Sequence, residues 1–150
     1  DDPRIHDNKV KVQIIGRREL LPDSVNEAID YAENKTRDYD NFVFTICLAY
    51  GSREEMIRAV QSIATDHAEG KIKLEEIDEK AVSDRLYTAE MPDPDLVIRT
   101  SGEERISNFL LWQMAYSELY FTDVFWPSFQ KKDLLKAIRT FQERRRRYGS

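Results

Sequence analysis

The hydrophobic pattern of the chain alternates between short apolar runs and longer amphipathic stretches. Apolar runs rich in β-branched and aromatic residues predict strands, whereas apolar positions three or four residues apart predict helices. The predicted strands are residues 10–15, 42–49 and 96–98, with a weaker one at 119–121. Helices are expected from Ser24, from Ser52, over 81–87 and 109–116, and from about 131 to 147. This order predicts an α/β fold with a mainly parallel β-sheet surrounded by helices, in one domain spanning residues 1–150.

Helix caps and apolar stripes define the predicted helices more closely. Ser24 with Glu27, and Ser52 with Glu55, have the spacing of a capping box. Gly70 is expected to end the second helix, and two prolines break the chain before the third strand. The side chains expected to face the core are Val25, Ala28, Ile29 and Ala32 in the first helix, Met56, Ile57, Val60, Ile63 and Ala64 in the second, and Leu134, Leu135, Ile138 and Phe141 in the last.

The predicted sheet is small for its class. Residues 42–49 form a nearly continuous apolar run, which is typical of a strand covered on both faces. A doubly wound sheet normally holds five or more strands, whereas three clear strands and one weak strand are predicted, with no helix before residue 10. The sequence therefore indicates either a small member of the class or a chain that lacks an N-terminal part.

Composition narrows the function without assigning it. The 150 residues carry a formal net charge of −5, so the overall field does not favour nucleic acid or anionic lipid. Any phosphate site must therefore be local. The single cysteine, Cys47, lies in an apolar run and fits a small buried hydrophobe in a reducing, cytoplasmic compartment. No apolar run approaches the ~20 residues of a membrane span, which predicts a soluble protein.

Two arginines flank the polar turn that follows the third strand. Arg99 ends this strand and Arg105 precedes the apolar run 109–116. The planar guanidinium group suits phosphate oxygens, and two such groups on one loop can clamp a diphosphate. The alternative is that each arginine pairs with a neighbouring acid, Glu103 or Glu104.

The main chain of the same turn favours the anion site. Ser101 and Gly102 would allow main-chain N–H groups to approach an anion closely. Ser107 is placed to cap the predicted helix after it, and helix N-termini bind anions. Together with the two arginines, this pattern predicts a phosphate-binding loop between a buried strand and a buried helix.

Other charged residues leave alternatives open. Glu118 follows the predicted apolar helix and could bind Mg²⁺, a hard cation that prefers oxygen ligands, or could be a surface charge at a helix end. Arg53 could add a third positive group at the sheet's carboxyl edge or be a solvated first-turn arginine. The chain contains no GxGxxG, GxxxxGK[ST] or CxxC motif, which argues against a dinucleotide enzyme, a P-loop nucleotide triphosphatase and a redox protein.

The segment DLVIRTSGEERISNFLLWQMAYSELYFTDVFWPSF, residues 95–129, closely resembles the C-terminal signature of the cis-prenyltransferases, the undecaprenyl diphosphate synthase family. Weaker similarity in VKVQIIG, YGSR and RRYG extends the resemblance over essentially the whole chain. The resemblance implies a Mg²⁺-dependent homodimer that condenses isopentenyl diphosphate onto an allylic diphosphate with new cis double bonds. The implied product is a long-chain polyprenyl diphosphate, a lipid-carrier precursor, and contact with the membrane would come only through it.

The same resemblance implies roles for individual residues. Arg99 and the motif Arg105-Ile106-Ser107 would bind isopentenyl diphosphate, and Glu118 would be a Mg²⁺ ligand. Arg147, in an Arg-x-Gly motif, would reach the diphosphate site of the partner subunit. No residue of this chain is assigned a catalytic role beyond binding.

Two departures from the family pattern qualify these roles. The N-terminal His-x-Asp-Gly-Asn-x-Arg-like signature, which supplies the other Mg²⁺ ligand and the allylic site, is absent. We therefore expect a C-terminal portion that keeps the isopentenyl diphosphate half-site and is inactive alone.

Ala49 stands where bacterial members usually have asparagine, which favours an archaeal-type member. The alternatives are a non-catalytic subunit of a heteromeric prenyltransferase and a phosphate-binding regulatory domain. Neither the allylic primer nor the product length follows from these residues.

Overall fold

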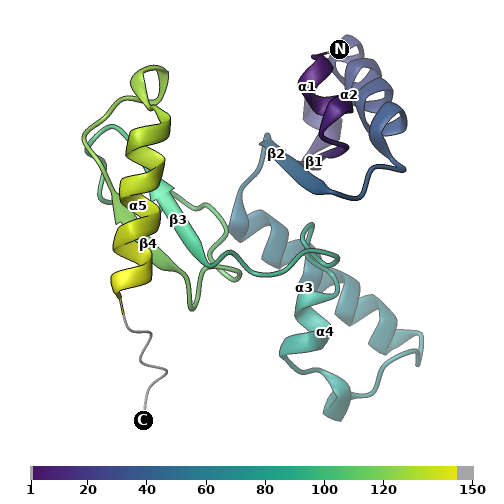
Figure 1. Cartoon of the computed structure of the whole chain (residues 1–150). Helices are drawn as coiled ribbons and strands as arrows, with labels where there is room; N and C mark the ends of the chain where they lie inside the picture. Colours follow the sequence, from purple (N-terminus) through teal and green to yellow (C-terminus); the bar gives the residue numbers. More distant parts are fainter. Residues whose placement is uncertain (1, 145–150) are drawn as a thin grey trace. The chain divides into compact units, whose positions relative to one another are not determined.

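The computed structural model describes residues 2–144. The chain divides into two compact units, Asp1–Met91 and Pro92–Ser150 (Figure 1). The boundary between them falls at the prolines that were expected to interrupt the chain. Each unit is an α/β structure built around a pair of parallel strands, which confirms the predicted fold class. The assignment of residues 1–150 to one domain stays a prediction.

The first unit contains the strands β1 (Val10–Gly16) and β2 (Phe42–Leu48), which pair in parallel from Val10 opposite Phe42 to Gly16 opposite Leu48. The helix α2 connects them and packs on β1. Both strands match the runs predicted from the sequence. The other elements of this unit are α1 (Pro3–Asp7), η1 (Arg18–Leu20), α2 (Asp23–Thr36), α3 (Ser52–Ala68), η2 (Leu74–Glu76) and α4 (Glu79–Ser83).

The helix starts differ from the predicted ones. Pro22 and Gly51 are the N-cap residues of α2 and α3, and neither helix has a side-chain cap. Each helix starts early enough to enclose the serine that was expected to cap it, so both predicted capping boxes are wrong. The helix α1, which was not predicted, begins at Pro3, and the Asp2 carboxylate accepts the Arg4 N–H at 2.9 Å.

The buried faces of the helices are narrower than the predicted stripes. In α3 the buried residues include Glu55, Ala59 and Ile63, spaced four apart, whereas Ile57 and Val60 are exposed. In α5 (Lys131–Glu143) Ala137 is buried, but Leu134 and Leu135 are exposed. Strand β2 also departs from expectation, because Phe42, Val43 and Phe44 are exposed rather than covered. No helix within residues 2–144 is both long enough and apolar enough to cross a membrane.

The second unit contains β3 (Leu96–Arg99), β4 (Glu118–Phe121), η3 (Trp126–Ser128) and α5. The strands β3 and β4 are parallel, with Leu96 opposite Glu118 and Arg99 opposite Phe121. The predicted helix at 109–116 is not present: this segment forms turns, two of them closed by Met114 N–H to the Leu110 carbonyl and Ser117 N–H to the Met114 carbonyl. Asn108 and Leu110 have φ angles of 60° and 46°, and a right-handed helix cannot contain such angles.

A buried carboxylate connects the end of β2 to the segment after α4. Glu55 is 1% exposed. Its Oε2 accepts the Tyr50 hydroxyl at 2.5 Å, and its Oε1 accepts the main-chain N–H of Tyr87 at 2.8 Å. Burial, together with the Glu55 carboxylate, raises the pKa of Tyr50, so the hydroxyl remains a donor at neutral pH. This carboxylate therefore holds two segments that are about thirty residues apart in the sequence.

We predict that Glu55→Ala lowers the free energy of unfolding by about 2–3 kcal/mol, because it removes a buried carboxylate that accepts two part-buried hydrogen bonds, from the Tyr87 N–H and the Tyr50 hydroxyl. Urea denaturation followed by circular dichroism measures this change. The exposed Glu75 provides the matched control, since Glu75→Ala should change the stability by less than about 0.5 kcal/mol. Equal stabilities of the two variants would contradict a structural role for the Glu55 contacts.

Candidate functional site

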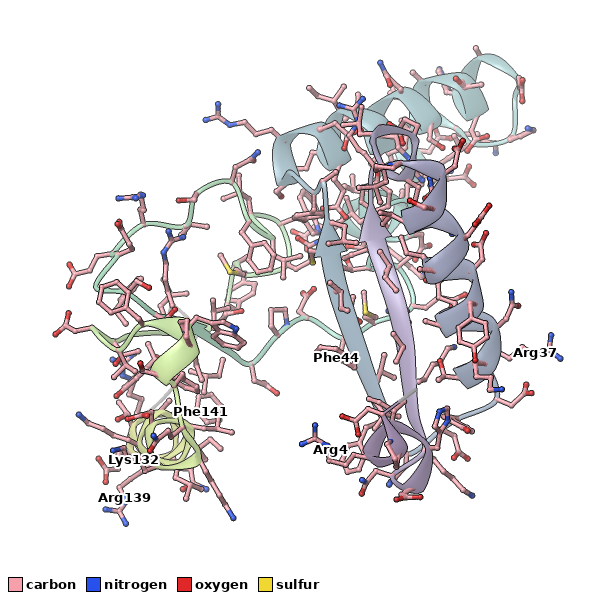
Figure 2. All side chains as sticks on the ribbon, turned by 90° about the horizontal axis from the view of Figure 1, so that it is seen from above. Arg4, Arg37, Phe44, Lys132, Arg139 and Phe141 are labelled. Carbon is pink, nitrogen blue, oxygen red and sulfur yellow. The ribbon has the colours of Figure 1, made fainter. Side chains whose placement is uncertain are left out.

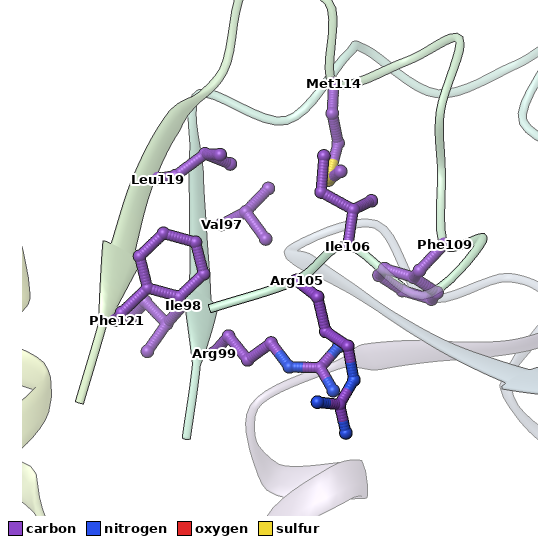
Figure 3. Close-up of a pocket in the computed structure, with 9 residues that line it drawn as sticks. All are labelled: Val97, Ile98, Arg99, Arg105, Ile106, Phe109, Met114, Leu119 and Phe121. Carbon is purple, nitrogen blue, oxygen red and sulfur yellow. The ribbon is translucent and has the colours of Figure 1, made fainter. Parts of the chain in front are cut away.

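The parallel pairing of β3 with β4 determines where Arg99 lies. Arg99 is the last residue of β3, so its side chain stands at the carboxyl end of the strand pair. In open α/β sheets ligands bind outside this end. Arg105 comes from the loop that follows. Figure 3 shows the two side chains converging, so that their guanidinium groups lie next to each other.

Both arginines line a cavity of about 130 Å³ within the second unit. The cavity is partly open to solvent, so a bound group could extend beyond it. Its remaining walls are apolar. They are formed by Val97, Ile98, Ile106, Phe109, Met114, Leu119 and Phe121 (Figure 3). The cavity is therefore amphipathic, with positive charge supplied by two guanidinium groups and hydrocarbon elsewhere.

The two arginines differ in their ion pairs. Arg105 pairs with Glu103, as the alternative from the sequence allowed, and two thirds of its side chain is exposed (66%). Arg99 makes no ion pair with any residue in the range 2–144. Two neighbouring guanidinium groups balanced by a single carboxylate leave excess positive charge at the cavity. An anion bound between them would remove their mutual repulsion.

Two main-chain N–H groups of the turn are already bonded to other parts of the second unit. The Ser101 N–H donates to the Val124 carbonyl at 3.0 Å, and the Gly102 N–H donates to the Thr122 carbonyl at 2.9 Å. These bonds fasten the turn to the segment after β4. Gly102 has a φ of 69°, and a Cβ there would lie 3.0 Å from Asp123 Oδ1. The glycine thus permits a close packing of the turn, and the expected anion contact through these two N–H groups is wrong.

Ser107 does not take the expected position. It is exposed, has a φ of 52°, and is not among the residues that line the cavity. Because residues 109–116 form turns, there is no helix N-terminus for Ser107 to cap. The structure brings Arg99, Arg105 and Ile106 together, and leaves Ser107 outside this group. Its role in binding stays a prediction.

Glu118 lies at the opposite end of the strand pair from Arg99. It begins β4 opposite Leu96, three register positions from Phe121, the partner of Arg99, which corresponds to about 10 Å along the strand. Its side chain is 23% exposed and pairs with Arg144, whose Nη1 lies 3.0 Å from Glu118 Oε2. Arg144 also donates to the Leu119 carbonyl at 2.8 Å. Glu118 is therefore an ion-paired strand residue, not a carboxylate at a helix end.

These residues do not by themselves form a magnesium site. Mg²⁺ prefers six oxygen ligands in a regular octahedron. Within residues 2–144 no group of three or more His, Cys, Asp or Glu side chains could hold a metal ion, and Glu118 is engaged by Arg144. Its assignment as a metal ligand stays a prediction. Arg147 lies outside the described residues, and Arg53 is an exposed residue in the first turn of α3.

Sequence reasoning missed most of the cavity wall. Phe109 and Met114 were assigned to a buried helix, but they line the cavity from turns. Leu119 and Phe121 were recognised as strand residues without a role in the site. The one available signal was that side chains along a strand point alternately to its two faces, which places Leu119 and Phe121 on the same face of β4. Arg144, the ion-pair partner of Glu118, was given no role from the sequence.

The comparisons with known proteins decide the family. The family model "Putative undecaprenyl diphosphate synthase" matches residues 1–149. The chain belongs to this family. The resemblance to cis-prenyltransferases seen in the sequence is thereby confirmed, and archaeal relatives dominate the matches, as the residues 49–53 indicated.

Individual members of the family show how much of their length this chain covers. A tritrans,polycis-undecaprenyl-diphosphate synthase (geranylgeranyl-diphosphate specific) of Pyrococcus horikoshii is 55% identical over 148 residues, which are 99% of this chain and 56% of that protein. The corresponding protein of Methanocaldococcus jannaschii is 52% identical, with 99% and 54% covered. The chain therefore spans little more than half the length of these relatives.

Two solved structures of prenyl diphosphate synthases are similar to this chain over nearly its whole length. The lavandulyl diphosphate synthase from Lavandula x intermedia, in complex with dimethylallyl diphosphate, gives a TM-score of 0.95 at 35% identity, covering 98% of this chain and 64% of that one. The structure of a "probable undecaprenyl diphosphate synthase" from Campylobacter jejuni gives a TM-score of 0.82 at 33% identity, covering 99% and 67%. The α/β architecture described above is thus the architecture of the family.

The ion pair between Glu103 and Arg105 leads to a first prediction for the cavity. Glu103→Gln should tighten the binding of inorganic diphosphate about two- to fivefold, because it removes the carboxylate that competes for Arg105; the gain is limited by the exposure of the pair. Isothermal titration calorimetry at low salt measures the affinity. Glu104→Gln removes the same charge from the neighbouring position and is the control. Identical affinities of the two variants would mean that Arg105 does not contact the anion.

Proposed function

We propose that this chain binds isopentenyl diphosphate in the cavity between Arg99 and Arg105, as part of a cis-prenyltransferase. The observation that carries the proposal is the amphipathic cavity itself: two adjacent guanidinium groups beside a small apolar space. The diphosphate would bind the arginines through charge-assisted hydrogen bonds. The five-carbon hydrocarbon would lie against the apolar wall, which includes Ile106 and Phe109.

The reaction proposed for the whole enzyme is the condensation of this unit onto an allylic diphosphate. A carbon–carbon bond forms between the two isoprenoid groups, diphosphate leaves the allylic carbon, and a proton is lost to give the new cis double bond. The residues of this chain contribute binding and orientation, which by holding two reactants in register supply a large part of a rate enhancement. We assign no proton transfer to any residue of the chain.

The remaining components of the proposal come from the relatives. Their names specify geranylgeranyl diphosphate, and we propose it as the allylic primer for the longer enzyme, with a long-chain polyprenyl diphosphate as product. Magnesium is part of the proposal, with Glu118 as one ligand and the others from outside residues 2–144. A homodimer in which Arg147 reaches the partner subunit's site completes it. The bound metal would neutralise diphosphate charge.

Binding of isopentenyl diphosphate tests the cavity directly. Arg105→Ala should weaken this binding by about 1.5–3 kcal/mol, or roughly 10- to 150-fold, since it removes a charged hydrogen bond to the diphosphate. Titration calorimetry gives the affinity. Arg139→Ala is the control. It removes an exposed guanidinium group from α5, outside the cavity (Figure 2), and should have little effect on the affinity. If parent and Arg105→Ala bind equally well, the isopentenyl diphosphate site lies elsewhere.

The 150-residue chain alone should show no prenyl transfer from geranylgeranyl or farnesyl diphosphate plus isopentenyl diphosphate and Mg²⁺. The reason is that its described residues do not form a complete metal site and that it spans about half of its relatives. Incorporation of labelled isopentenyl diphosphate into longer products is the measurement. Turnover by the chain alone would refute the half-site proposal. Failure to bind isopentenyl diphosphate at all would instead favour a non-catalytic subunit.

A further inference from the structure

The part of the cavity wall that follows Arg105 is built on a tight turn. The Phe109 N–H donates to the Ile106 carbonyl at 3.3 Å, which closes a four-residue turn with Ser107 and Asn108 at its centre. The φ angles of these two central residues are 52° and 60°, so both are left-handed. Two left-handed central residues are characteristic of a type I′ turn, the mirror image of the common type I turn. The direction in which the chain leaves the turn therefore depends on an uncommon backbone conformation.

The two end residues of this turn belong to the cavity. Ile106 and Phe109 both line it, whereas the two central residues do not. Figure 3 shows their side chains, together with that of Met114, on one side of the cavity, with the residues of β3 and β4 on the other side. A turn of the opposite hand would direct the chain differently and would move Phe109 out of this wall.

The same two end residues offer apolar surface that a ligand can cover. Ile106 is 38% exposed and Phe109 is 39% exposed, whereas Met114 beside them is buried. Phe121 of β4 is exposed to a similar extent, but the strand register holds it in place and not a turn. Binding gains free energy only from apolar surface that it removes from water. A hydrocarbon on a diphosphate held by the two arginines would therefore gain affinity from these side chains, whereas methyl diphosphate, with one carbon, would gain little.

The chemistry of Asn108 suits the left-handed turn. Apart from glycine, asparagine is among the residues that adopt left-handed angles most readily, because its short polar side chain can form local hydrogen bonds. A β-branched residue strongly disfavours these angles. Asn108 is exposed and lies outside the cavity lining, so a substitution there changes the backbone preference and leaves the wall residues themselves unaltered. Ser107 is less suitable for a test, because the family resemblance implies that it binds the ligand.

We propose that Asn108 is a positioning residue for the isopentenyl group. Its left-handed backbone holds Ile106 and Phe109 in the cavity wall, and this wall makes the site prefer isopentenyl diphosphate to a diphosphate ester with a shorter hydrocarbon. Asn108 acts through these two side chains and not through a contact of its own with the ligand. The inference rests on the proposed function, because it requires isopentenyl diphosphate to bind in this cavity.

The selectivity between two diphosphate esters tests this role. Titration calorimetry on the 150-residue chain gives the affinities for isopentenyl diphosphate and for methyl diphosphate. Asn108→Val should lower the affinity for isopentenyl diphosphate at least about fourfold, the change expected when one methylene group is no longer buried, and should leave that for methyl diphosphate within about twofold. Asn108→Gly should keep the selectivity of the parent, because glycine adopts left-handed angles without strain.

Two further variants control the test. Ser128→Val introduces valine at an exposed residue of η3, outside the cavity, and should leave both affinities unchanged. Asn108→Thr is a second β-branched substitution that keeps a polar side chain, and it should have the same effect as Asn108→Val. Circular dichroism shows whether each variant is folded; if one β-branched variant is not, the other decides.

Three outcomes would overturn the proposal. Equal losses of both affinities in Asn108→Val would mean that the turn supports the arginines and not the hydrocarbon wall. Unchanged selectivity in both β-branched variants would mean that the turn does not position the wall. Loss of selectivity in Asn108→Gly would assign the effect to the asparagine side chain and not to its backbone. Failure of the proposed function gives a different result, because the parent chain would then bind neither ester.

Discussion

The parallel register of β3 and β4 is the constraint on which the candidate site depends. Parallel pairing places Arg99 and Phe121 together at the carboxyl end of the two strands, and Leu96 and Glu118 at the amino end. The chain that continues from β4 accepts the N–H groups of Ser101 and Gly102, so the turn after β3 is attached to the same end. Arg105 therefore reaches the cavity from a loop whose first residues are held by main-chain hydrogen bonds. The strand register and these loop hydrogen bonds thus place the two arginines at the same end of the strand pair.

The positive charge at the candidate site is opposite in sign to the net charge of the whole chain. The sequence carries a formal net charge of −5, yet the cavity holds two guanidinium groups with Glu103 as the ion-paired acid. Long-range attraction of an anionic substrate by the whole chain is thus unfavourable, and binding must come from short-range contacts within the cavity. In the proposed site the apolar wall would strengthen a diphosphate contact with Arg99 more than one with Arg105, whose side chain is 66% exposed, because a charge pair shielded from water attracts more strongly.

The parts of the structure that sequence reasoning predicted are those determined by local hydrophobic pattern. The apolar runs at 10–15 and 42–49 became β1 and β2, and even the weak run at 119–121 became β4. Where the backbone adopts left-handed φ angles, the hydrophobic pattern predicts the wrong structure. Residues 109–116 are apolar enough for a buried helix, but Asn108 and Leu110 have positive φ, and no composition rule marks a leucine for that conformation. Arg99 and Arg105 were found because arginine chemistry is specific. The wall formed by Phe109 and Met114 was missed, because tertiary packing alone brings them there.

The core of the first unit leaves the apolar side chains at the start of β2 outside it. Glu55 and Ser52 are the largest fully buried side chains, and the buried apolar residues of this unit are Ile15, Ile29, Ala59, Ile63, Ala81 and Leu86. The aromatic side chains of β2, by contrast, remain half exposed. Complete burial of a phenylalanine or valine side chain contributes about 1.5–3 kcal/mol, so covering the exposed parts of Phe42, Val43 and Phe44 would contribute roughly 2.5–5 kcal/mol. That is a sizeable fraction of the ~5–15 kcal/mol by which a domain is stable. Contacts within residues 2–144 therefore leave this part of the possible apolar burial unused.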